Sequence, residues 1–80
     1  MNAEDIKALI ATGFACEHIE VEGDGRHWFA VIVSSAFEGK NRVQRQRMVN
    51  ATVQAKMATD ELHALSMKTL TPAEWAERQA

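Results

Sequence analysis

Residues 17–33 read EHIEVEGDGRHWFAVIV, and this stretch decides the fold. In its first half Ile19 and Val21 alternate with polar and acidic residues, which is typical of a strand with one face in water. The glycines on either side of Asp24 favour a tight turn. Residues 28–33 are apolar on both faces, as in a central strand. The stretch therefore predicts an antiparallel hairpin whose second strand lies inside a sheet.

Helices are expected on both sides of this hairpin. Asn2 is a suitable N-cap for an N-terminal helix, which we expect Gly13 to end as its C′ residue. Residues 40–58 contain neither Gly nor Pro and predict the longest helix. Apolar residues recur in it every four positions and are expected to face the sheet: Val49, Val53 and Met57.

The last third of the chain predicts three further elements. Residues 59–62 favour a short extra helical turn, and residues 63–69 alternate like a third strand. Residues 71–74 read TPAE, a capping box with proline at the first helical position, so a final helix begins there and Trp75 anchors it. The order α-β-β-α-α-β-α predicts an α+β fold in one domain, residues 1–80, with a three-stranded mixed sheet and helices on one face.

This order places a long helix between the second and third strands. Neighbouring strands joined in that way are parallel, with a right-handed crossover. Parallel strands start at the same edge of the sheet, so His27 and His63 are expected to converge there. Cys16 precedes the oppositely directed first strand and is expected at the other edge, roughly 15–20 Å away.

Two imidazoles at one edge allow two interpretations. Imidazole suits zinc, copper or iron, although two ligands are too few for a closed metal site. The alternative is a pair of solvated polar residues at strand ends. Cys16 is more simply a small, half-buried thiol than a metal ligand or redox group.

The charge of the chain is unevenly distributed. The net charge is −2, yet residues 40–56 carry five bases and no acid. Four of these bases are candidates for phosphate contacts: Lys40, Arg42, Arg45 and Arg47. The alternative is a solvated helix face, because the segment lacks aromatic residues and a glycine-rich phosphate loop.

Size and composition narrow the class of protein. With 80 residues the chain buries only a small core, which disfavours a self-contained enzyme, and we find no nucleophile–base–orienter trio. The single cysteine excludes an intramolecular disulfide. No apolar run approaches 18 residues and no signal-peptide core follows Met1, so a cytoplasmic protein is expected.

Several motifs together resemble the BolA-like protein family over roughly residues 3–77. They are the GDGRHWF and VIVS segments of residues 23–34, the FEG of residues 37–39 leading into Arg45, and the HALSMKT and TPAEW segments of residues 63–75. The turn and the ending resemble most closely the IbaG (YrbA) subgroup. Many family members have a His after the helix arginine, where this chain has Gln46.

The resemblance implies a class II KH-like fold, without the Gly-x-x-Gly loop that clamps RNA. It also implies a non-enzymatic partner of a monothiol glutaredoxin, monomeric or weakly dimeric alone, that shares a [2Fe–2S] cluster. His63 and His27 match the family's ligand positions, and the glutaredoxin cysteine and glutathione would supply the remaining ligands.

A second theme of the family is binding to double-stranded DNA. The resemblance implies transcriptional regulation in the stress response, through a region that maps approximately to residues 40–62. The four bases named above lie at the start of that region.

Overall fold

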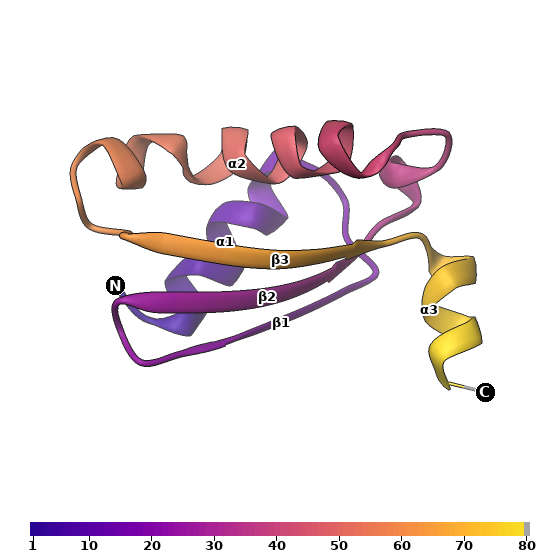
Figure 1. Cartoon of the computed structure of the whole chain (residues 1–80), viewed down its shortest axis with the longest axis horizontal. Coiled ribbons are helices and arrows are strands. Elements are labelled where there is room, and N and C mark those ends of the chain that lie inside the picture. The colour runs from indigo at the N-terminus through magenta and orange to yellow at the C-terminus, as the bar shows by residue number, and fades with distance from the viewer. Residues whose placement is uncertain (80) are drawn as a thin grey trace.

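The computed structural model describes residues 1–79, and Ala80, the last residue of the predicted domain, lies outside them. Along the chain the elements are α1 (Ala3–Gly13), β1 (His18–Gly23), β2 (His27–Val33), the 3-10 turn η1 (Ser35–Phe37), α2 (Arg42–Ala58), β3 (Ala64–Leu70) and α3 (Pro72–Gln79) (Figure 1). Among the described residues no helix is both long and apolar enough to span a membrane.

The three strands form one mixed sheet in the order β1-β2-β3. β1 pairs with β2 in the antiparallel sense and β2 pairs with β3 in the parallel sense. The predicted hairpin, the central position of the second strand and the parallel neighbour are thus confirmed. Both edges of β2 are paired, and its side chains on the helix-covered face, Trp28, Ala30 and Ile32, are buried.

The helices α1 and α2 cover one face of this sheet (Figure 1). Each begins with a capping box, Asn2 with Asp5 and Asn41 with Gln44. The prediction of Asn2 as an N-cap is thus confirmed. The buried side chains of both helices pack against those of β2. Burial of each fully buried aliphatic side chain contributes about 1.5–3 kcal/mol to the free energy of folding. This core comprises Ile6, Ile10, Trp28, Ala30, Ile32, Phe37, Val49, Val53 and Leu62.

Gly13 has a different role from the expected one. It is the last helical residue of α1, followed by Phe14 as the C-cap, and it does not adopt the left-handed conformation of a C′ glycine. A Cβ atom at Gly13 would overlap the Cγ2 atom of Thr52 on α2. The glycine is needed because two helices approach closely there.

Two further expectations about the end of α2 are wrong. Met57 does not face the sheet: its side chain is 37% exposed, and burial along this stripe ends at Val53. Residues 59–62 form no helix but a turn in which Asp60 has a φ of 61°. This turn brings Leu62 into the core, where it is 1% exposed, and the structure has three α-helices among the described residues.

The third helix contacts the opposite face of the sheet. Along β2, Trp28, Ala30 and Ile32 point into the core, so Val33 points the other way. Val33 pairs with His18 and with Leu70, and the ring of His18 stacks on Trp75 with 4.7 Å between ring centroids. The expectation of helices on one face therefore holds for α1 and α2, whereas α3 covers one end of the other face.

Candidate functional site

The two candidate ligand histidines lie where two adjacent parallel strands begin. His27 is the first residue of β2 and is aligned with Ala64, the residue directly after His63. From the spacing of neighbouring strands, the Cα atoms of His27 and His63 lie on the order of 6 Å apart. Both side chains are exposed to solvent. Residues 36 positions apart in sequence are thus brought together at one edge of the sheet, as the topology predicted.

The turn before β2 fixes the position of His27. The Oδ1 atom of Asp24 accepts hydrogen bonds from the backbone N–H groups of Arg26 and His27, each at 2.9 Å. These hydrogen bonds lower the pKa of the Asp24 carboxyl, the one from His27 having the largest effect. Gly25 has a φ of 98°, a conformation that glycine adopts without strain. The loop that carries the first imidazole is therefore internally braced.

A shallow hollow of about 480 Å³ lies beside His27. Its lining includes Trp28, whose indole packs over Gly23 so closely that a Cβ atom there would lie 2.7 Å from Cε3. Phe29, 40% exposed, and Ser66 also line it. The His27 imidazole thus adjoins a partly apolar surface that is open to a partner molecule.

The imidazole nitrogens of His27 and His63 could supply some, but not all, of the ligands of a metal site. Within residues 1–79 no group of three or more His, Cys, Asp or Glu side chains could hold a metal ion. Histidine replaces cysteine at one iron of some [2Fe–2S] clusters, so two imidazoles match one iron of such a cluster in donor type and number. The arrangement therefore fits a group whose other ligands come from a second molecule.

Cys16 lies at the other edge of the sheet, as expected. It precedes β1, whose first residue pairs with Val33 at the end of β2. Burial, and secondarily the charge of Glu17, raises the pKa of its thiol, which disfavours the thiolate that metals and electrophiles require. Both its position and its chemistry separate Cys16 from the histidine pair.

The four predicted phosphate-binding bases are not equivalent. Lys40, Arg42 and Arg47 are exposed around the first turns of α2. The side chain of Arg45 is only 14% exposed and lies over the ring of Phe37, with 5.8 Å from Cζ to the ring centroid. Sequence reasoning grouped these residues because charge patterning does not reveal which side chain folds inward.

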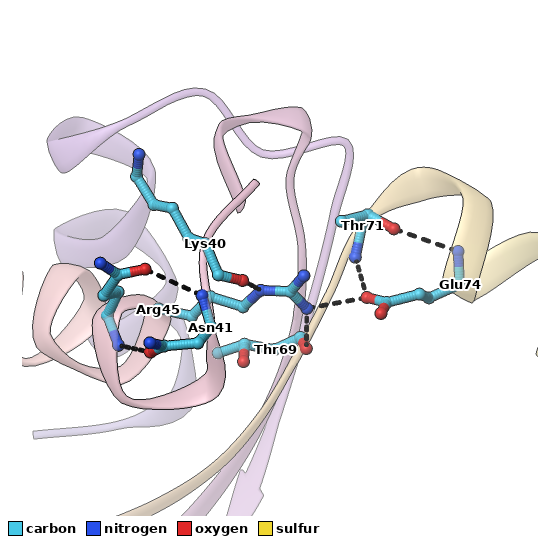
Figure 2. A network of polar contacts seen from close by, with 7 residues as sticks. Lys40, Asn41, Arg45, Thr69, Thr71 and Glu74 are labelled. Carbon is cyan, nitrogen blue, oxygen red and sulfur yellow. Dashed lines mark hydrogen bonds and ion pairs between the residues drawn. The ribbon is translucent and has the colours of Figure 1, made fainter. Parts of the chain in front are cut away.

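Arg45 joins α2, β3 and α3 through a network of polar contacts (Figure 2). Its Nε donates to the carbonyl of Lys40 at 2.9 Å, and its Nη1 donates to the carbonyl of Thr69 at 3.2 Å and to Oε1 of Glu74 at 2.8 Å. Glu74 also accepts from the backbone N–H of Thr71. The TPAE capping box predicted the Thr71–Glu74 contact, but nothing in the sequence pointed to Arg45 as its third member.

Comparisons with known proteins agree with this architecture. The family model described as "BolA-like protein" matches residues 6–74. The acid stress protein IbaG of Escherichia coli is 33% identical over 95% of this chain and 90% of its own length.

Two solved structures share the fold. A bol-like protein from Babesia bovis superposes with a TM-score of 0.86 at 31% identity, covering 100% of this chain and 95% of that one. The BolA domain of SufE1 from Arabidopsis thaliana has a TM-score of 0.80 at 31% identity, covering 90% and 93% of the two chains. By family match, sequence identity and fold, the chain belongs to the BolA-like protein family.

Proposed function

We propose that this chain is a non-enzymatic, cytoplasmic partner of a monothiol glutaredoxin and that it contributes His27 and His63 to a [2Fe–2S] cluster held jointly with glutathione. The observation that supports the proposal is the parallel pairing of β2 with β3, which aligns His27 with the residue after His63. The membership of the chain in the BolA-like family makes an iron–sulfur role plausible.

The chain's own residues would perform two tasks in such a complex. The two imidazoles would provide neutral nitrogen donors, one from the first residue of β2 and one from the residue directly before β3, the strand that pairs with it. The Asp24 hydrogen bonds hold the loop so that the His27 donor needs little reordering when a partner binds. When bound, the cluster itself would supply the iron, the electron-transfer chemistry and the visible absorption.

Co-expression with a monothiol glutaredoxin in the presence of glutathione tests the proposal. The complex is expected to show visible absorption and circular dichroism that differ from those of the glutaredoxin alone. His63→Ala and His27→Ala are expected to remove or alter these bands. His18→Ala is a matched control, because His18 is a partly exposed histidine at the other end of the sheet.

Two measurements test different parts of the proposal, the ligand assignment and the partner assignment. If His63→Ala leaves the spectrum of the complex unchanged, the ligand assignment is wrong. If size-exclusion chromatography detects no complex of the wild-type chain with a monothiol glutaredoxin, the partner assignment is wrong. The His18→Ala control separates a loss of the bands caused by a missing ligand from a general effect of replacing a histidine.

Regulation through double-stranded DNA has less support from the geometry. Arg45 donates three hydrogen bonds to other residues of the chain. Of the four bases predicted to contact phosphates, this leaves Lys40, Arg42 and Arg47 exposed. Each true phosphate contact gives a slope of about −0.9 in a log–log plot of affinity against salt concentration. A duplex titration with a slope near zero would eliminate this alternative.

A further inference from the structure

We propose that the basic pocket between the start of α2 and the end of β3 binds the phosphate group of a small phosphate monoester. The pocket has a volume of about 500 Å³, within the roughly 300–1,000 Å³ range of small-molecule sites. It lies at the end of β3 remote from His63, so it is separate from the histidine pair. Four basic residues line it: Lys40, Arg42, Arg45 and Lys68.

The charge in this pocket is strongly positive although the chain as a whole is acidic. Among the described residues Glu74 is the only acid in its lining, and that carboxylate is already bound by Arg45 and by the Thr71 N–H. Four bases against one acid leave three uncompensated positive charges. A phosphate monoester, which carries about −1.5 to −2 at neutral pH, matches this charge better than a carboxylate does.

Lys68 is the one basic residue of this lining that lies outside the segment at the start of α2. It belongs to β3, 23 or more positions after the two α2 bases of this lining, Arg42 and Arg45, and charge patterning of the sequence does not connect it with them. The fold places it with Lys40 and Arg42 around one hollow. Bases from two elements that surround a concavity indicate a ligand more strongly than bases along one solvated face.

Arg45 supplies a rigid donor in this lining. Its Nε and Nη1 are held by two carbonyls and one carboxylate, so the plane of the guanidinium is fixed (Figure 2). Its Nη2 donates to no residue among those described. Within residues 1–79 the one fully buried side-chain N or O atom without a partner is Trp28 Nε1, so Nη2 is not fully buried. A fixed guanidinium loses little entropy when it binds a phosphate oxygen.

The positions of these bases also oppose the dipole of α2. Its first turn contains no acid and begins with Arg42, and Lys40 directly precedes the N-cap Asn41. Positive charges at the N-terminal end of a helix are unfavourable by several tenths of a kcal/mol each, and a bound anion reverses that effect. The same end of α2 therefore gains stability when the pocket is occupied by phosphate.

Titration of the ¹⁵N-labelled full-length chain with inorganic phosphate, at constant ionic strength in sodium chloride, tests for the site. We expect saturating shifts of the backbone amides of Asn41, Arg42 and Thr69, and of the Nε–H of Arg45. Sodium acetate is expected to be much weaker. Shifts that are scattered over the chain, that fail to saturate, or that acetate reproduces would overturn the proposal.

Two single-charge variants distinguish a pocket from diffuse charge. Lys68→Gln removes a pocket base and is expected to weaken phosphate binding by about fivefold. Arg47→Gln removes the same charge from α2, but Arg47 lines a different hollow with Asn50 and Gln54, so binding should be unchanged. Both side chains are exposed, so both variants are expected to fold. An equal loss in the two variants would contradict the pocket.

Competition identifies the source of the phosphate. Glycerol phosphate is expected to displace inorganic phosphate, whereas an equal concentration of phosphate groups in a duplex DNA is not. Displacement by the duplex, weakened equally by Lys68→Gln and Arg47→Gln, would assign the bases to a nucleic-acid backbone and overturn the monoester assignment. Failure of glycerol phosphate to compete would overturn it as well.

Discussion

The guanidinium of Arg45 contacts the carboxylate of Glu74 across 29 positions of the sequence, with 2.8 Å between Nη1 and Oε1. This contact is the direct polar link between the start of α2 and the start of α3. Since Thr69 and Thr71 join the same network, it fixes how β3 leaves the sheet. Two of the predictions below concern this network.

Replacement of Arg45 is expected to destabilise the protein. Arg45→Gln leaves the carbonyls of Lys40 and Thr69 without their charged donor, in a position where the side chain is 14% exposed. We expect a loss of about 2 kcal/mol in the free energy of unfolding, measured by urea denaturation. Arg47→Gln is the control and should change it by less than about 0.5 kcal/mol. Equal effects would contradict the structural role of Arg45.

Glu74 is expected to make stability depend on acid pH. The Thr71 N–H, and then the Arg45 hydrogen bond, lower the pKa of its carboxyl below the ordinary value of 4.5. A lowered folded-state pKa gives a contribution that is present above the unfolded pKa and is lost as the pH falls through the folded one. The stability difference between the wild type and Glu74→Gln should therefore be largest near pH 6 and shrink below about pH 4. A difference that is constant from pH 6 to pH 3 would show that the Glu74 charge contributes nothing.

Gly13 and Thr52 should show energetic coupling. Gly13→Ala adds a Cβ that overlaps Cγ2 of Thr52, and overpacking of this kind costs about 1–3 kcal/mol. Thr52→Ser removes Cγ2 but keeps Oγ1, which donates to the carbonyl of Val49 at 2.6 Å. In the Thr52→Ser background, Gly13→Ala is expected to be neutral or stabilising because alanine favours the helix. A double-mutant cycle by urea denaturation measures this, and additive effects would rule out the close approach.

Cys16 is expected to react slowly and to be dispensable for the proposed [2Fe–2S] cluster. Because burial raises the pKa of its thiol, alkylation of the folded chain at pH 8 should be slower than that of free cysteine. Denaturation should restore the ordinary rate. Cys16→Ser should leave the visible spectrum of the glutaredoxin complex unchanged, whereas His63→Ala should not. Loss of the visible bands in Cys16→Ser would indicate that Cys16 is a ligand, and would contradict the assignment of the ligands to the edge that carries His27 and His63.

Much of the fold follows from local sequence signals. The alternation at Ile19 and Val21, the turn at Asp24 and the capping residue Asn2 each determine a local conformation, and each of these predictions is confirmed. The convergence of His27 and His63 also follows, because a strand–helix–strand unit with neighbouring strands leaves one arrangement of chain direction.

The remaining features depend on contacts that no local pattern encodes. Gly13 is a glycine on account of Thr52, which belongs to another helix. Met57 continues the apolar spacing of α2, but the turn at Asp60 lets Leu62 fill the core instead. The inward fold of Arg45 depends on Glu74 and Thr69, both far along the chain. Such tertiary contacts decide which member of a sequence pattern is structural and which remains free.

The pairing of β2 with β3 has a thermodynamic consequence. His27 and His63 lie close together along the backbone of the sheet only while these strands are joined, so the unfolded chain does not hold the two histidines together. Any molecule that needs both nitrogens is consequently a selective ligand of the native state, and mass action couples its occupancy to the folding equilibrium. At a concentration 100-fold above its dissociation constant, such a ligand raises the unfolding free energy by about 2.7 kcal/mol.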